Sequence, residues 1–492
     1  MGTFILLCLV GVLTTFTHLY NPIRFPPGPS NDESIYMRRS MHVLTGQGPQ
    51  EGSLYDHPYF SQIFLAGALG VIGYPKSSYP SLGSLQSVET LYLVPRVLLG
   101  ILAIIDTFLI YKISGNLYGK QVALIASILF AAMPLTWLIR RVWLEPIQLP
   151  FILSSILFAT YIKINDKTNE NKNNKLNLAV LFSGVFLGLA ILTKIPAITM
   201  IPLVAFLIYT GRNNLKRLLL LFIPVILIPL IWPAYAIYNG QFDFWLSGVL
   251  WQTHRGIHTF FSSMIYDFSI DPLLIALGIS GAVFAALKRD FFLLFWFIPF
   301  LIFLYLIGFV SYWHVVPLLP AFCIAAARLL EFLSNVASRK RSYQKLIMSI
   351  VITAVGMFGL INTILLVIPI NHNSAYFEAA AFIIKYLRSN NSSDITVISN
   401  PFYSWIPQSI LNLNYNYVDY YNGEISVKTH KVLLIVDPAL IYILKNHEAA
   451  NLIQKNFNLY TANRIANFVG SPNRHDQVSI YLYESNPNGK AN

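Results

Sequence analysis

The sequence predicts a mainly α-helical protein that crosses a membrane many times and carries a small α/β domain at its C-terminal end. Of its 492 residues, 55% are hydrophobic and only 11% are charged, whereas a soluble domain has about 25% charged residues. Apolar runs of about 18 or more residues, each long enough to cross a bilayer, recur as far as residue 370. Beyond it, shorter segments alternate between strand and helix patterns. These observations predict a transmembrane helical bundle followed by a domain outside the membrane.

The apolar runs predict about eleven membrane spans. The first run, "FILLCLVGVLTTFTHLY", lacks a basic n-region and a small-residue cleavage site. We therefore expect a retained span that also serves as a signal anchor. The expected spans cover residues 3–20, 90–112, 121–139, 146–163, 178–194, 196–211, 218–238, 272–287, 291–309, 313–333 and 346–370.

The loops rich in Lys and Arg indicate how these spans are oriented. With eleven spans, the loops "YGK", "KINDKTNENKNNK", "GRNNLKR", "KRD" and "SRKRSYQK" all lie on the side of the N-terminus. Because such loops are enriched on the cytoplasmic side, the N-terminus is predicted to be cytoplasmic. Segments 21–89 and 239–271 and the chain beyond 370 are then extracytoplasmic, and we expect a multi-pass protein of the plasma membrane.

The net charge of +12 does not indicate a nucleic-acid partner. Up to Ile370 the chain holds 25 basic and 14 acidic residues, and the remainder holds 9 and 8. The excess therefore lies mainly in short loops between spans, as orientation in a membrane requires. Cys8 and Cys323 both fall inside apolar runs, so neither a disulfide framework nor a thiolate metal site is expected.

Two domains are expected, a transmembrane module over 1–370 and an extracytoplasmic α/β domain over 371–492. In the first outer segment, "DESIYMRRSMHVLTG" predicts an amphipathic helix ended by Gly46. The next apolar stretch, "YFSQIFLAGALGVIGYP", predicts a helix at the membrane interface. In the C-terminal domain, "DITVISN", "KVLLIVDP" and "VSIYLYES" predict strands, whereas "SAYFEAAAFIIKYLRSN" and "PALIYILKNHEAANLIQKNF" predict helices.

Four cations break the orientation rule because they lie at the outer ends of spans. They are Arg96, Arg140, Arg141 and Lys194. Each could extend to lipid headgroups or pair with Glu89 or Glu145. Taken together, cations at one depth favour a pocket for an anion such as a lipid phosphate. His314, in "SYWHVVPLLP", lies at the same level, where an aromatic anchoring stripe is the alternative explanation.

Two groups of acidic residues lie on the outer loops. Ser30 and Glu33 match the S-x-x-E capping box, which accounts for Glu33 without invoking function. Asp32 is not needed for the cap, and the helix dipole favours its ionised form. Asp56 and His57, in "SLYDHPYFSQ", form an ordinary turn that becomes a candidate site together with Asp32.

Two further features point to less specific roles. His254 and His258 have the i,i+4 spacing of metal ligands, but a pair without a third ligand assigns no metal site. Asp106 falls in the cytoplasmic half of its span, and we expect it to be a buried, paired group.

Six motifs, in order along residues 1–330, resemble those of the GT-C superfamily of membrane glycosyltransferases. The nearest branches are the dolichyl-phosphate-mannose protein mannosyltransferases and the aminoarabinose transferases. Tyr59 replaces the second proline of their H-P-P element, and Glu145 stands where Asp is usual. The W-W-D-Y-G element of the related oligosaccharyltransferases is absent. The matching motifs are "NDESIY", "YDHPYF", "RVLLG", "RRVWLEP", "GVFLGLAILTK" and "YWHVVPLLP".

This resemblance implies transfer of a sugar from a polyprenyl- or dolichyl-phosphate carrier to a hydroxyl of a protein, lipid or glycan, with inversion, at the outer membrane face. Asp32 would be the general base, and Glu33 would cap the helix that aims it. Asp56, His57 and Glu145 would line the sugar or acceptor side. No cofactor is required, a divalent metal is compatible with a monophosphate donor, and the composition favours an archaeal source. The leaving phosphate would be met by Lys194, Arg96, Arg140, Arg141 and His314.

Two other function classes fit the composition. A flippase or carrier for lipid-linked sugars would also need many spans and basic outer pockets. It would need polar groups along both halves of its spans, however, and the cytoplasmic halves offer little besides Asp106. A structural membrane protein with an exposed α/β sensor is the third interpretation.

Overall fold

The computed structural model describes most of the chain as two compact units. The first, called the helical unit here, comprises Met1–Tyr20, Gln50–Ser61 and Leu98–Leu366. The second, called the mixed unit, comprises Asn21–Pro49, Gln62–Val97 and Val367–Asn492. The residues described are 2–26, 28, 30–78, 84–165, 173–209, 214–253, 255, 259–337, 341–368, 371, 373–420, 429–446, 463–470 and 477–484.

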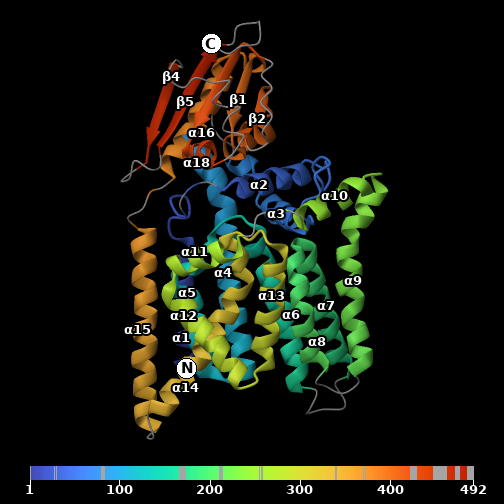
Figure 1. Cartoon of the computed structure of the whole chain (residues 1–492), viewed down its shortest axis with the longest axis vertical. Helices are drawn as coiled ribbons and strands as arrows, with labels where there is room; N and C mark the ends of the chain where they lie inside the picture. The colour runs from blue at the N-terminus through green and yellow to red at the C-terminus, as the bar shows by residue number, and fades with distance from the viewer. Residues whose placement is uncertain are drawn as a thin grey trace. The chain divides into compact units, whose positions relative to one another are not determined.

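The helical unit consists of apolar helices joined by short connections (Figure 1). A long helix, α4 (Leu85–Tyr118), begins in the mixed unit and continues into the helical unit. Among the described residues, 3₁₀ segments that interrupt the bundle include η2 (Pro134–Arg140), η4 (Ile195–Met200) and η5 (Tyr312–Leu318). The other helices are α1 (Gly2–Leu19), α5 (Lys120–Ala132), α6 (Leu144–Asn165), α7 (Asn173–Thr193), α8 (Ile201–Tyr209), α9 (Asn214–Tyr238), α10 (Phe242–Thr253), α11 (Phe260–Ile270), α12 (Pro272–Leu287), α13 (Phe291–Ile307), α14 (Leu319–Ala337) and α15 (Arg341–Val367).

Each of the predicted spans coincides with an apolar helix or helix pair. Among the described residues, six helices are long and apolar enough to cross a membrane, and up to eight spans result if each bent pair counts as one. The bent pairs are α5 with η2, at 68°, and α11 with α12, at 117°. The remaining predicted spans, 3–20, 196–211 and 291–309, correspond to shorter apolar helices. The predicted polytopic helical fold is confirmed.

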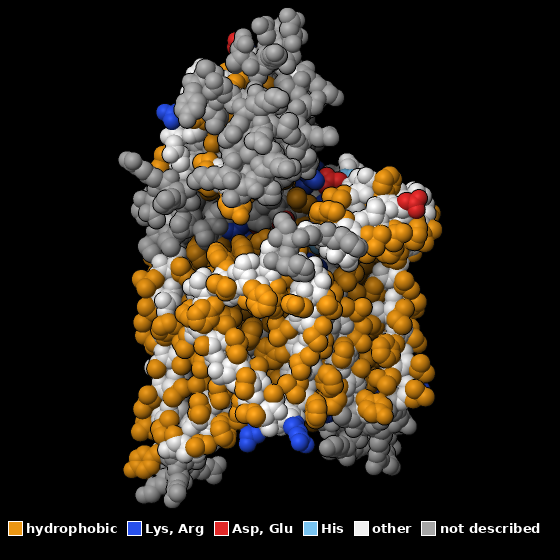
Figure 2. Space-filling view, in the orientation of Figure 1, with side chains coloured by type: hydrophobic (Ala, Val, Ile, Leu, Met, Phe, Trp, Pro, Cys, Tyr) orange, Lys and Arg blue, Asp and Glu red, His pale blue; other side chains and the backbone are white. Residues whose placement is uncertain are grey.

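The surface of the helical unit is suited to contact with lipid. Figure 2 shows hydrophobic side chains over most of the visible face of this unit. Helices α9 and α15 are the least buried of the candidate spans, with 22% and 17% of their apolar windows inside the structure. Because exposed apolar patches of this extent are rare on soluble proteins, the outer surface fits a bilayer environment.

Glycine permits close packing between α7 and α9. Gly184 and Gly188, one helical turn apart on α7, belong to the motif "GVFLGLAILTK". A Cβ at Gly184 would lie 2.6 Å from the Leu221 carbonyl oxygen, and one at Gly188 would lie 2.6 Å from that of Pro224. This small-xxx-small spacing lets two membrane helices approach until their backbones are in contact.

A five-stranded mixed sheet forms the centre of the C-terminal part of the mixed unit. The strand order is β2-β1-β3-β5-β4, and β1 pairs in parallel with both β2 and β3. β5 pairs antiparallel with β3 and β4. All residues of β1 are buried, as expected for a parallel strand covered on both faces. The strands are β1 (Ile395–Ser399), β2 (Asn416–Asp419), β3 (Lys431–Val436), β4 (Asn463–Val469) and β5 (Gln477–Glu484).

The helices of the mixed unit follow the predicted pattern. α2 (Asn31–Leu44) is followed by Gly46, whose φ of +77° ends the helix. α3 (Phe60–Val71) forms where the sequence predicts a helix, and its place at the membrane interface stays a prediction. In the C-terminal part, α16 (Ser374–Ser389) packs on β4 and β5, and α17 (Pro401–Trp405) packs against α2. α18 (Pro438–Asn446) is the described part of the last predicted helix. The small α/β domain is thus confirmed.

Adding one methyl group between α7 and α9 is expected to destabilise the bundle. Gly184→Ala would force the two backbones apart, at a cost of about 1–3 kcal/mol. The control is Gly11→Ala in α1, where a Cβ would meet nothing within 4 Å, so the better helix former should leave stability unchanged or slightly higher. Thermal unfolding of the purified variants in detergent measures the difference, and equal midpoints would contradict the packing.

Candidate functional site

A buried ionic group lies where several elements of the helical unit end. Glu145 is in the first turn of α6 and its side chain is only 3% exposed. The Lys194 ammonium donates to Glu145 Oε1, and His314 Nε2 lies 3.6 Å from the same oxygen. Three sequence-predicted residues from separate segments thus meet at one carboxylate. The pairing of Lys194 with Glu145 is the alternative that the sequence left open.

The position of Lys194 depends on a break in the helix. α7 ends at Thr193, and Lys194 is extended, with φ −156° and ψ 131°. η4 follows, with Pro196 at its start. Gln148, one turn along α6 from Glu145, donates its amide to the carbonyl oxygens of Ala190 and Lys194. Gln148 therefore satisfies carbonyl groups that the end of α7 would leave without partners. Helix α6 thus contacts Lys194 twice, binding its ammonium through Glu145 and its backbone through Gln148.

The hydrogen bonds of His314 define its tautomer. The backbone N–H of Ser311 donates to His314 Nδ1 over 3.0 Å. In neutral imidazole one ring nitrogen accepts and the other carries the proton. Nε2 is then the protonated nitrogen, and it faces Glu145. His314 can therefore present an N–H donor to a nearby oxyanion without carrying a charge itself.

A further cation, Arg255, acts on this group, and aromatic rings connect Arg141 to the segment that carries His314. Arg255 stacks on Trp251 and Phe309 at 4.2 and 4.7 Å, and its charge acts on His314 as do those of Lys194 and His57. Arg141 lies 5.4 Å from the ring of Trp143, which packs on Tyr312 and Trp313 of η5. The name "Glu145 cluster" is used below for Arg141, Glu145, Lys194, Arg255 and His314. Its cations outnumber its carboxylate, which favours an anionic ligand.

Arg140 makes different contacts from its neighbour Arg141. Its side chain is fully buried, and it donates to the carbonyl oxygens of His18 and Tyr20 at the C-terminal end of α1. A guanidinium there satisfies carbonyl groups that lack helical partners and complements the helix dipole. One role of Arg140 is therefore to anchor the C-terminal end of α1.

Asp56 and His57 lie in a turn of the helical unit that α10 supports. Asp56 Oδ1 accepts from the backbone N–H of the next residue, His57, at 2.9 Å. Gln252, on α10, donates to the Asp56 carbonyl oxygen at 3.0 Å. Both side chains are half-buried. His57 is close enough to act electrostatically on His314, which brings this turn to the Glu145 cluster.

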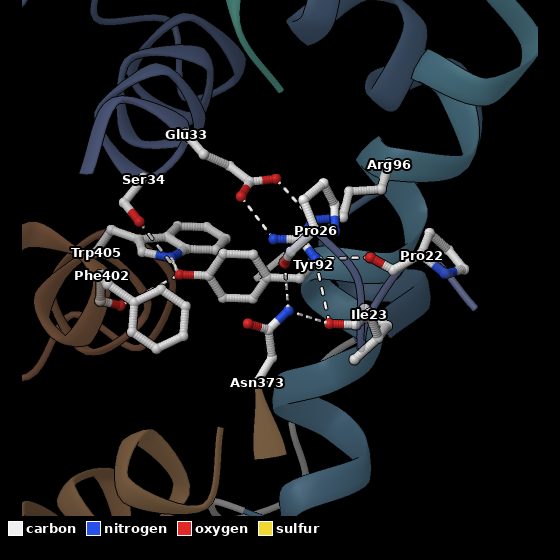
Figure 3. A network of polar contacts seen from close by, with 10 residues as sticks. All are labelled: Pro22, Ile23, Pro26, Glu33, Ser34, Tyr92, Arg96, Asn373, Phe402 and Trp405. Atoms are coloured by element: carbon white, nitrogen blue, oxygen red, sulfur yellow. Dashed lines mark hydrogen bonds and ion pairs between the residues drawn. The ribbon is translucent and has the colours of Figure 1, made fainter. Parts of the chain in front are cut away.

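The mixed unit holds the start of α2 by a buried ion pair (Figure 3). Arg96 donates through Nε and Nη2 to the two oxygens of Glu33, at 2.8 and 2.6 Å. Ser30 is the N-cap as predicted, but its side chain makes no capping hydrogen bond. The predicted capping box is therefore wrong. The carboxylate of Glu33 binds a guanidinium that can satisfy both of its oxygens at once.

The segment before α2 is fixed by the same arginine and by the C-terminal part of the unit. Arg96 Nη1 donates to the carbonyl oxygens of Pro22 and Ile23, at 2.7 and 3.4 Å. Asn373, at the N-cap of α16, donates to Ile23 and Pro26 at 2.7 and 2.9 Å. Asp32, next to Glu33 in the first turn of α2, is half-buried. The anchor thus leaves Asp32 partly accessible.

Some polar groups were missed or misjudged from the sequence. Gln148 could have been found, because "EPIQ" places it three residues after Glu145 on one helix face. Asp267, on α11, gave no signal beyond its position in an outer segment. Within the described part of the chain, both oxygens of Asp267 and of Asp106 are buried without a hydrogen-bond partner. The expectation that Asp106 is paired is therefore wrong, because its surroundings supply no donor.

No metal site is formed by the residues that the structure describes. Among them, no three His, Cys, Asp or Glu side chains lie close enough together to hold an ion. His254 and His258 lie outside the described residues.

Comparisons with known proteins agree with this architecture. A family model described as dolichyl-phosphate-mannose-protein mannosyltransferase matches residues 86–236. ArnT from Cupriavidus metallidurans, in a structure bound to undecaprenyl phosphate, is similar over 98% of this chain and 98% of its own, at 13% identity and a TM-score of 0.60. No curated protein sequence matches the chain.

A second solved structure has the same architecture. The oligosaccharyltransferase AglB from Archaeoglobus fulgidus, in complex with an inhibitory peptide and a dolichol-phosphate, is similar over 93% of this chain and 72% of its own, at 11% identity and a TM-score of 0.61. The chain therefore has an ArnT- and AglB-like fold. The resemblance that the motifs suggested is confirmed for the fold, and the family-model match over residues 86–236 agrees with it.

Removing Arg96 is expected to destabilise the protein strongly. Arg96→Met leaves the Glu33 carboxylate buried without its partner, which costs about 3–5 kcal/mol. The double variant Arg96→Met/Glu33→Met removes both charges and should recover much of the loss. The matched control, Arg328→Met, breaks a less buried pair with Asp290, in which the arginine is 21% exposed, and should cost less. Thermal unfolding measures these three variants and Glu33→Met, which completes the double-mutant cycle. Additive losses for Arg96 and Glu33 would contradict the pairing.

Proposed function

We propose that this protein is an integral membrane glycosyltransferase that passes a sugar from a polyprenyl- or dolichyl-phosphate carrier to an acceptor hydroxyl. The observation that carries the proposal is the Glu145 cluster, a cation-rich group of the apolar helical unit in which Arg141, Glu145 and Lys194 are buried and Arg255 and His314 are half-buried. A lipid-linked phosphate combines an apolar chain with an anionic head. The similarity in fold to ArnT and AglB, whose solved structures contain undecaprenyl phosphate and a dolichol-phosphate, supports this choice of carrier.

The Glu145 cluster would stabilise the leaving phosphate. When the bond between the anomeric carbon and the phosphate oxygen breaks, negative charge develops on that oxygen. Fixed donors in a site poor in water stabilise such charge most effectively. Lys194, Arg141 and Arg255 supply cations, and His314 supplies a neutral N–H. Glu145 holds the ammonium of Lys194 in place and would share it with the phosphate.

Two of the cations selected from the sequence receive a different role in this proposal. Arg96 donates to Glu33 and to two backbone carbonyls, and Arg140 donates to the end of α1. Donors engaged in this way are not available to a ligand without loss of those contacts. We therefore assign both arginines to the scaffold rather than to the phosphate.

Asp32 would act as the general base. It would accept the proton of the acceptor hydroxyl while that oxygen attacks the anomeric carbon and the lipid phosphate leaves from the opposite face, giving inversion. Its place in the first turn of α2 favours the ionised form that a base needs. A positioned base contributes about 10²–10⁴-fold to such a rate. Asp56 and His57 would contact the sugar or the acceptor, and the reaction needs no cofactor.

For the orientation in the membrane we propose the arrangement that the sequence predicts. The N-terminus would be cytoplasmic, and the C-terminal α/β domain would be outside the plasma membrane, because five basic loops share the side of the N-terminus. The acceptor would then be an extracytoplasmic hydroxyl of a protein, lipid or glycan.

Asp32→Asn is expected to lower kcat by about 10²-fold or more with little change in KM for the donor. The control is Asp243→Asn, because Asp243 is also the second residue of its helix but is exposed. Purified protein in lipid vesicles would receive a panel of radiolabelled polyprenyl-phosphate sugars, and sugar transferred to membrane acceptors or released by hydrolysis would be counted. Unchanged activity of Asp32→Asn would exclude it as base. Movement of intact donor between leaflets, without transfer, would identify a carrier instead.

Lys194→Met is expected to weaken binding of the bare lipid phosphate at least tenfold, because it removes a desolvated cation from the cluster. The control is Lys288→Met, which removes an exposed lysine. Lys288 lies at the C-terminal end of α12, and it is the opposite end of this helix that contacts η2, where Asp271 accepts from the backbone N–H of Leu135. Titration of each purified variant with undecaprenyl phosphate measures the affinities. Equal affinities for the two lysine variants would contradict the assignment of the phosphate to this cluster.

A further inference from the structure

The C-terminal domain contacts the helix that carries Asp32, and this contact suggests a role for the domain. We propose that Tyr92, Trp405 and Asn373 are positioning residues through which the C-terminal sheet fixes α2 for the transfer reaction. This inference rests on the proposed function, because it gives these residues a role in aligning its base. All of them lie in the mixed unit.

The hydroxyl of Tyr92 joins three segments (Figure 3). Tyr92, on α4, donates to the carbonyl oxygen of Phe402 at 3.2 Å. Trp405 Nε1 donates to the same hydroxyl, and Ser34 Oγ of α2 lies 3.3 Å from it. A phenolic hydroxyl has one proton to donate and can accept hydrogen bonds as well. With Ser34 as donor, the hydroxyl group of Tyr92 donates once and accepts twice. It connects α4, α2 and α17.

Aromatic packing encloses this hydroxyl. The Tyr92 ring lies 5.2 Å from Phe377 of α16, and 5.0 and 5.3 Å from Phe402 and Trp405 of α17. Tyr92 and Trp405 are both fully buried. Because burial removes competing water, the loss of one hydrogen bond here leaves a polar group unsatisfied rather than hydrated. The group has little freedom to rearrange.

The contacts of Tyr92 continue those of Arg96. The two residues are four apart on α4 and therefore lie on the same face, one turn from each other. They hold the consecutive residues Ser34 and Glu33 of α2. Asp32 is the next residue toward the N-terminus. These two contacts from α4 therefore define the position of the first turn of α2 and its rotation about the helix axis.

The sheet fixes the position of α17 in turn. Asn400, directly after β1, accepts from the Phe402 backbone N–H at 2.9 Å and so caps α17. Its amide donates to Asp437, directly after β3, at 2.7 Å. Burial raises the pKa of Asp437, while hydrogen bonds from Leu440 and Tyr420 oppose that rise. The carboxyl ends of two adjacent parallel strands thus hold the helix that contacts Tyr92.

Asn373 adds a second connection from the C-terminal domain. It precedes α16 and binds the carbonyl oxygens of Ile23 and Pro26, in the segment that leads into α2. The start of α2 is thus held by α16 on its N-terminal approach and by α17 through Tyr92. A displacement of about 1 Å at a catalytic group can cost about 10²-fold in rate. Loss of either connection should therefore lower the rate more than it lowers donor binding.

The test compares two buried tyrosines on the mixed unit. Tyr92→Phe keeps the ring and removes the hydroxyl. Tyr74→Phe is the matched control, because the buried Tyr74 hydroxyl donates to the Leu91 carbonyl oxygen of α4 at 2.8 Å rather than to α2. We expect Tyr92→Phe to lower kcat about tenfold with KM for the labelled polyprenyl-phosphate sugar within twofold, and Tyr74→Phe to leave both unchanged.

Hydrogen–deuterium exchange of peptides covering α2 provides a readout that does not depend on activity. Exchange there should rise in Tyr92→Phe and not in Tyr74→Phe. Trp405→Phe should also raise exchange in α2. Because Tyr92→Phe and Trp405→Phe remove the same connection, the kcat of the double variant should be no lower than that of the slower single variant. Unchanged exchange in α2, or raised exchange with unchanged kcat, would overturn the inference. A wild type without transferase activity would contradict the proposed function, whereas the exchange comparison would still decide whether Tyr92 holds α2.

Discussion

The buried pair of Glu33 and Arg96 is the interaction on which the arrangement of the mixed unit depends. Two charges can be withdrawn from water only if their geometry is good and their remaining hydrogen-bonding groups are satisfied. Both oxygens of Glu33 are bound by Arg96, and the third guanidinium nitrogen binds backbone carbonyls of the segment before α2. Because neither charge is tolerated alone, α4, α2 and that segment must assemble together. Asp32 gains a defined position from this requirement.

The charges of the Glu145 cluster must also be compensated, but here the cations outnumber the carboxylate. Glu145 compensates Lys194, and Gln148 satisfies the carbonyls that the end of α7 leaves open. Arg141 and Arg255 lie against aromatic rings. Stacking on a ring partly stabilises the charge of a guanidinium. In the proposed function, the cations of this cluster stabilise the phosphate of the donor.

Local patterns predicted the elements better than the contacts between them. Apolar runs gave the helices of the predicted spans, and alternation gave β1, β3 and β5, because both depend on neighbouring residues. The helices α10, α11 and α17 were not predicted. The strands β2 and β4 were missed; "NYVD" is short and polar, and "NRIANFV" does not alternate cleanly between apolar and polar residues. The pattern S-x-x-E suggested a cap for Glu33, but its partner lies 63 residues away. Trp405 and Asn373 gave no signal, because a residue that contacts a distant helix has no local spacing to reveal it.

The candidate residues were found more readily than their roles. Cations at the outer ends of spans stand out because the bilayer makes them costly, and this led to Lys194 and Arg141 as well as to Arg96 and Arg140. Only their contacts in the structure distinguish Lys194 and Arg141, which we assign to the phosphate, from Arg96 and Arg140, which we assign to the scaffold.

The most direct test of the central claim is the anomeric configuration of the product, determined by NMR after transfer from a donor of known configuration. The proposed single displacement by an Asp32-activated hydroxyl predicts inversion, and retention would contradict it.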